Sequence, residues 1–142
     1  MNSTSTVSVV ASAYTSNNGT CGTLAGVTGQ GKGTLTVTAA ATQVMFGVQP
    51  SNTAHGSNIT PAVTVLIEDA GYNVVTSSTA TVAIAIGTNP GGGTLSGTVS
   101  LNAVAGVATF STLNINNAGV GYTIGASSFG LNSANSNSFN ET

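Results

Sequence analysis

Apolar and polar residues alternate along most of this chain, at the period of two that is typical of β-strands. The alternating segments are bounded by clusters of Gly, Asn and Pro, which favour turns. No stretch shows the i, i+3, i+4, i+7 spacing that predicts an amphipathic helix. The pattern predicts strands at residues 4–13, 33–40, 43–49, 62–69, 80–86, 94–104, 106–115, 120–128 and 135–141.

The pattern changes near residue 42, and we predict two parts. Residues 43–142 contain seven of the predicted strands, and many short strands separated by turns are typical of a β-sandwich or barrel. Residues 1–42 contain the long alternating strand 4–13, a Gly/Thr-rich loop and a second strand. We therefore expect an all-β fold, with a sandwich at 43–142 and an N-terminal β extension at 1–42.

The second part carries a set of short phrases that occur together. They are Phe-Gly-Val-Gln-Pro-Ser at 46–51, Pro-Ala-Val-Thr-Val at 61–65 leading into Glu-Asp-Ala-Gly-Tyr-Asn-Val-Val at 68–75, Gly-Gly-Gly-Thr-Leu-Ser-Gly at 91–97, Gly-Val-Ala-Thr-Phe at 106–110 and Ala-Gly-Val-Gly-Tyr-Thr-Ile at 118–124. As a set, they resemble the bacterial immunoglobulin-like (Ig-like) repeats of large surface and adhesin proteins. The resemblance implies an Ig-like β-sandwich of about seven strands. It implies no single function, because such modules serve as spacers, adhesins, pilus-like subunits and phage decorations.

One tyrosine has a predicted structural role. Tyr122 follows Ala-Gly-x-Gly at the start of a late strand. In sandwiches of this kind that is the place of a tyrosine corner, whose hydroxyl bonds to the backbone a few residues upstream. The alternative is an ordinary half-buried strand tyrosine.

Charge is scarce, and this scarcity excludes several functions. Only four of the 142 residues carry a formal charge, namely Lys32, Glu68, Asp69 and Glu141. One cation can neutralise neither nucleic-acid phosphates nor an anionic lipid surface, and no run of about 18 apolar residues predicts membrane insertion. General acid–base catalysis needs positioned titratable groups. We therefore expect no nucleic-acid partner, no membrane insertion and no enzymatic activity.

The few chemically active residues form one acidic pair and two isolated side chains. Glu68 and Asp69, with Asn73, are a candidate Ca²⁺ site, although adjacent strand residues point to opposite faces. The alternative is that Asp69 caps its own turn. His55 has no metal-ligating residue near it in sequence, so we interpret it as a solvated loop residue. We expect no cofactor.

Cys21 is the only cysteine, so it cannot form an intrachain disulfide. It is either a small, partly buried side chain or surface thiol, or half of an intermolecular disulfide. Four Asn-x-Ser/Thr sequons would accept glycans in a secreted protein. They begin at Asn2, Asn18, Asn58 and Asn140.

The predicted strand edges carry almost none of the features that prevent association. Soluble sandwiches protect their edge strands with Lys, Pro or inward-pointing charges, and this chain has one Lys and three Pro. We therefore predict that other subunits cover the edges. The strand 4–13 is the candidate donor, and residues 135–142 are a rival. The predicted assembly residues are Thr6, Val7, Val9, Val10 and Ala11.

Strand donation from one subunit to the next adds backbone hydrogen bonds and does not close on itself. The sequence thus predicts a structural subunit of an extracellular, pilus-like filament, a head-to-tail homopolymer at the cell surface. The alternative is an Ig-like binding module, either of a surface adhesin with cell-surface or glycan contacts or of a decoration protein on a phage or virion surface.

Overall fold

A computed structural model of the chain describes residues 39–142. These residues form an all-β fold and contain no helix within that range. The predicted extension at 1–42 lies outside the described residues except for its last four. The first strand of the sandwich begins at Gln43.

Eleven strands make up the fold, all in antiparallel pairings within their sheets. They are β1 (Gln43–Val48), β2 (Val63–Glu68), β3 (Thr81–Ile86), β4 (Leu95–Ser96), β5 (Ser100–Asn102), β6 (Val107–Phe110), β7 (Asn114–Ile115), β8 (Gly119–Tyr122), β9 (Ile124–Ser128), β10 (Ala134–Asn135) and β11 (Phe139–Glu141).

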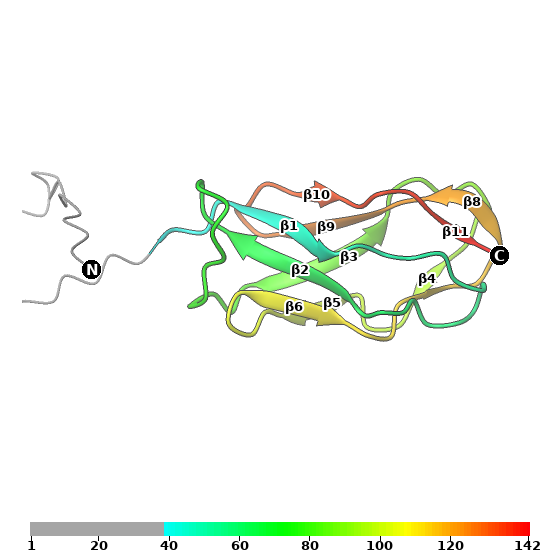
Figure 1. The fold of residues 1–142 in the computed structure, drawn as a ribbon, viewed down its shortest axis with the longest axis horizontal. Coiled ribbons are helices and arrows are strands. Elements are labelled where there is room, and N and C mark those ends of the chain that lie inside the picture. The colour runs from blue at the N-terminus through cyan, green and yellow to red at the C-terminus, as the bar shows by residue number, and fades with distance from the viewer. Residues whose placement is uncertain (1–38) are drawn as a thin grey trace, which may run out of the picture. The chain divides into compact units, whose positions relative to one another are not determined.

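The strands form two main sheets. One has the order β1-β2-β6 and the other β10-β9-β3-β5, while β11 pairs with β8 and β4 with β7. β1 begins at one end of the sandwich and Thr142 lies at the opposite end (Figure 1). The chain of this module therefore enters at one end and leaves at the other.

Seven strands were predicted over residues 43–142, and eleven are present because four of the predicted segments are each divided in two. The segment 94–104 is interrupted at Gly97, whose φ of 96° is accessible mainly to glycine. The segments 106–115, 120–128 and 135–141 are likewise divided. Seven strands still form the two main sheets, as the sequence predicts.

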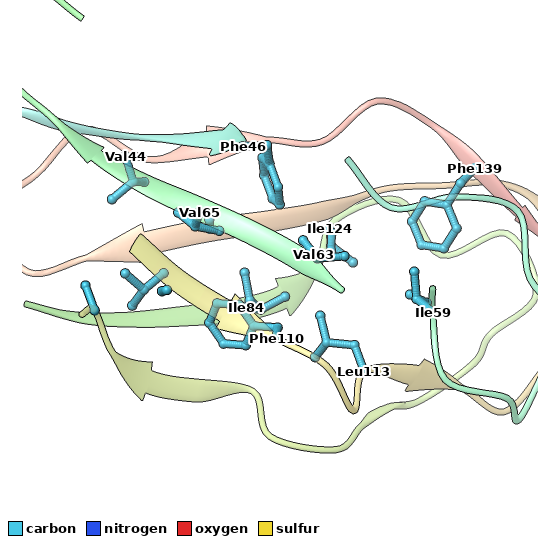
Figure 2. Packing of buried hydrophobic residues seen from close by; sticks show 14 of the residues in the cluster. Val44, Phe46, Ile59, Val63, Val65, Ile84, Phe110, Leu113, Ile124 and Phe139 are labelled. Carbon is cyan, nitrogen blue, oxygen red and sulfur yellow. The ribbon is translucent and has the colours of Figure 1, made fainter. Parts of the chain in front are cut away.

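The core lies between the two main sheets. Alternation places Val63, Val65 and Ile67 of β2 on the inner face, where each is fully buried. Phe110 of β6 is also fully buried, and Ile84 of β3 is nearly so. Figure 2 shows side chains from both sheets directed into one shared interior. The described residues thus bury a continuous core without a further strand.

The last strand belongs to this same fold. β11 pairs with β8 on one side and bridges Thr53 on the other. Phe139 is buried in the core, with its ring centroid 6.1 Å from that of Tyr122. The rival donor segment 135–142 is therefore occupied within its own module.

Candidate functional site

The acidic pair splits into two separate hydrogen-bonded groups. The Oδ1 atom of Asp69 accepts the backbone N–H groups of Gly71 (2.8 Å) and Asn73 (3.0 Å), and the Asn73 amide also donates to this carboxylate. Glu68 is buried, and its Oε2 accepts from Gln43 Nε2 at 3.2 Å. This arrangement is the turn cap that was the alternative to a Ca²⁺ site.

The cap also explains the titration of Asp69. Hydrogen bonds that stabilise the charged form lower a carboxyl pKa. The backbone N–H of Asn73 is the main cause that lowers the pKa of Asp69, and burial opposes it. The hydrogen bonds of the turn therefore favour the ionised form of Asp69.

His55 lies exposed in a loop beside the C-terminal strand. Its Nδ1 is 2.7 Å from the backbone oxygen of Thr142, and its backbone N–H donates to that same oxygen at 3.0 Å. No group of three or more His, Cys, Asp or Glu side chains within residues 39–142 could hold a metal ion. His55 therefore joins two chain segments.

Tyr122 is completely buried, and its hydroxyl donates to the carbonyl of Asn117 at 3.0 Å. The acceptor lies five residues upstream, which is the geometry of a tyrosine corner. A Cβ atom at Gly91 would overlap Ala118 O and the Tyr122 hydroxyl oxygen. Gly91 and Gly93 thus make room for this corner.

Of the two sequons in the described range, one is accessible. Asn58 is exposed in the loop before Ile59. Asn140 lies within β11, and its Oδ1 accepts the backbone N–H of Gly121 at 3.0 Å. Asn58 is therefore the better candidate for a glycan. Asn2 and Asn18 lie outside the described residues.

Sequence reasoning missed a buried carboxyl group. Glu141 is only 2% exposed, and neither of its carboxyl oxygens has a hydrogen-bond partner among the described residues. Burial raises the pKa of Glu141, while the nearby charge of His55 acts in the opposite direction. The only available signal was its alternation with Phe139, which places both side chains on one face of β11.

The two long sides of the sandwich differ. On the side of β1 and β10, the N–H of Val44 donates to the carbonyl of Asn132 at 3.0 Å, which joins the two sheets. β1 also has an irregularity between Phe46 and Val48, and such bulges disrupt a strand edge. We call this the closed side.

On the opposite side, formed by β5 and β6, Val104 and Val107 exchange backbone hydrogen bonds just after β5, and β5 itself pairs with no strand of the other sheet. Neither strand carries a charge or a proline, and neither pairing shows a register shift. β5 and β6 belong to different sheets, and each pairs with one strand only. We call this the open side.

Three large apolar side chains are exposed on the turns at the end where β1 begins. Tyr72 follows β2, Val104 follows β5 and Phe129 follows β9, and all three are strongly exposed. Tyr72 has a positive φ of 63°. These turns are the part of the described surface on which aromatic rings are available to a partner.

The predicted assembly residues Thr6, Val7, Val9, Val10 and Ala11 lie outside the described residues, as does Cys21. Within the described range, no helix is long and apolar enough to cross a membrane. A scan against protein-family models and a search of curated proteins find no match to this chain. The likeness to bacterial Ig-like repeats therefore remains a prediction, and the all-β sandwich-like fold is what is shown.

Proposed function

We propose that this chain is the structural subunit of an extracellular filament, in which residues 4–13 of one subunit add a strand to the next. The observation that carries the proposal is the open side. Its strands carry no charge, no proline and no register shift, which are three of the features that prevent edge pairing. Such an edge on an isolated subunit favours association through backbone hydrogen bonds.

The distribution of charge supports the same role. Residues 39–142 contain no Lys or Arg, and their three acidic residues are Glu68, Asp69 and Glu141. Glu68 and Glu141 are buried, and Asp69 is bound within its turn. Very little charge remains on the described surface to keep subunits apart.

The closed core defines how a donated strand would act. In this module the core is buried by the module's own strands. A donated strand would therefore extend a sheet instead of completing a fold. The opposite positions of the β1 start and Thr142 (Figure 1) suit head-to-tail growth.

The test is to delete residues 1–13 and compare the product with the full chain. Negative-stain imaging should show filaments for the full chain and single particles for the truncated chain. Filaments of normal appearance from the truncated chain would rule out this mode of assembly. A discrete monomer or trimer from the full chain would do the same.

A second candidate function rests on the exposed turns. Aromatic rings on loops are common anchors in binding sites, and Tyr72 and Phe129 are exposed on two turns of the module. This favours the alternative of a binding module, on a cell surface or on a virion. Glycan-array binding by a monodisperse full chain, lost in Phe129→Ser, would support it over a filament.

A further inference from the structure

The hydrogen bonds of β5 establish the direction of each of its backbone groups. Val99 accepts from Ile84 at 2.7 Å, and Ala103 donates to Ala80 at 3.0 Å. In an antiparallel pair, successive residues direct their N–H and C=O groups alternately toward the partner and away from it. The odd-numbered residues 99, 101 and 103 therefore face β3, and the even-numbered residues face the open side.

On the open side, the residues that flank β5 at each end already form hydrogen bonds within the module. The N–H of Thr98 donates to Thr112 Oγ1 at 2.9 Å. Val104 and Val107 exchange two backbone bonds, at 2.9 and 3.0 Å. Between these two bonded positions, the outward backbone groups of Ser100 and Asn102 have no partner among the described residues.

The edge strands β6 and β10 have fewer unused backbone donors and acceptors. On β6 the outward groups of Val107 are used by Val104, so Thr109 alone remains. β10 has two residues, and the register with β9 directs only Asn135 outward, because Ser136 donates to Ile124. β5 therefore presents more unused backbone donors and acceptors than β6 or β10.

We propose that the outward edge of β5, at Ser100 and Asn102, is the acceptor for residues 4–13 of a second copy of this chain. This inference rests on the proposed filament and names the surface that would receive the donated strand. Two facing residues give an added strand up to four backbone hydrogen bonds on this edge.

The proposed occupant suits this edge in pattern and in reach. Residues 4–13 alternate in sequence, and as an extended strand they would place Val7, Val9 and Ala11 on one face. Residues 14–38 separate that segment from the sandwich, and extended chain rises roughly 3.3 Å per residue, so the connection can span several tens of ångströms. Leu101, half-buried against the core, offers apolar surface beside the added strand.

Complementation between two full-length variants tests the proposal. Ser100→Pro removes an outward N–H and leaves the bonds to β3 in place, so this variant can donate a strand and cannot accept one. The pair Val7→Pro and Val9→Pro blocks the donor and leaves β5 intact. Each variant alone should be monomeric by light scattering, and their mixture should give a 1:1 complex.

Matched controls distinguish a failure of the β5 acceptor from a failure of the proposed filament. Asn135→Pro places the same residue on the edge of the closed side and should polymerise as the wild type does. Ser100→Lys with Asn102→Lys repeats the β5 block if Ser100→Pro lowers the melting temperature. Polymers from both β5-blocked variants, with none from the donor-blocked variant, would overturn the β5 acceptor and leave strand donation standing. Polymers from the donor-blocked variant would overturn the filament proposal itself.

Discussion

The interior of the sandwich and its open side differ in how completely their polar groups find hydrogen-bond partners. In the interior, Val65, Phe110 and Tyr122 are fully buried, and the Tyr122 hydroxyl has its backbone acceptor. On the open side, Ser100 and Asn102 keep outward backbone groups that no described residue bonds. The difference shows that the described core is closed by the module's own strands, while one edge keeps unused backbone donors and acceptors.

This comparison predicts that fold and assembly separate cleanly. Changes in the interior should alter the free energy of unfolding and leave the edge groups available. Changes on the open side should remove the edge groups and leave the free energy of unfolding nearly unchanged. The following variants test this separation, beginning with the largest expected change in stability.

Phe110→Ala should destabilise the module most. It removes a fully buried ring from the core, and such truncations cost about 3–5 kcal/mol. The matched control is Phe129→Ala, which alters a fully exposed ring and should change stability by less than about 0.5 kcal/mol. Urea unfolding measures both. Equal losses in the two variants would contradict the assigned core.

Glu141→Gln should stabilise the module at neutral pH, by roughly 1–2 kcal/mol, because it removes the cost of a buried, unpartnered charge. Burial raises the folded-state pKa of Glu141. Its contribution to stability is therefore fully present below the unfolded-state value, near pH 4, and is lost as the pH rises through the folded-state value.

Urea unfolding between about pH 4 and pH 7 checks this sign. The stability advantage of Glu141→Gln over the wild type should grow across that range. Asp69→Asn is the opposite control, since the pKa of Asp69 is lowered and its loss should destabilise at neutral pH. A wild type that is more stable than Glu141→Gln at pH 7 would show that the carboxylate has a partner.

Tyr122→Phe should cost about 1 kcal/mol, because it deletes the hydroxyl and leaves the carbonyl of Asn117 without its donor. Tyr72→Phe changes an exposed tyrosine in the same way and should leave stability unchanged. Thermal unfolding compares the two. If Tyr122→Phe unfolds at the wild-type temperature, the corner contributes nothing to stability.

Ser100→Lys with Asn102→Lys should have the smallest effect on folding, within about 0.5 kcal/mol, because both side chains are exposed. Its effect on assembly should nevertheless be complete. Sedimentation of the full chain would show this as a loss of the fast-moving species. Assembly at the wild-type level would show that the open side is not the surface through which the subunits associate.

Much of the fold follows from period-two alternation, since apolar residues on one face of a strand must be buried. The alternation predicts strands at 62–69 and 106–115, and these segments contain β2 and β6. The interruption at Gly97 was not predicted, because the alternation of Leu95, Val99 and Leu101 continues through it. A Cβ atom at Gly97 would overlap the carbonyl oxygen of Thr112, which the alternation of nearby residues does not reveal.

The open edge was predicted only in general terms, from the scarcity of charge and proline. The length of this edge is limited by hydrogen bonds at Thr98 and Val104. Their partners, Thr112 and Val107, lie outside β5 and its sheet. The burial of Glu141 was hidden for a similar reason. Its surroundings come from β8 and from residues near Thr53, which are distant in sequence.

Amide hydrogen exchange on the assembled full chain, read residue by residue along β5, tests the central claim most directly. Thr98 and Val104 donate within the module and should exchange slowly whether the chain is assembled or not. Ser100 and Asn102 should exchange rapidly in the donor-blocked variant Val7→Pro/Val9→Pro and slowly in the assembled wild type. Rapid exchange at Ser100 and Asn102 in the assembled wild type would contradict strand addition at this edge.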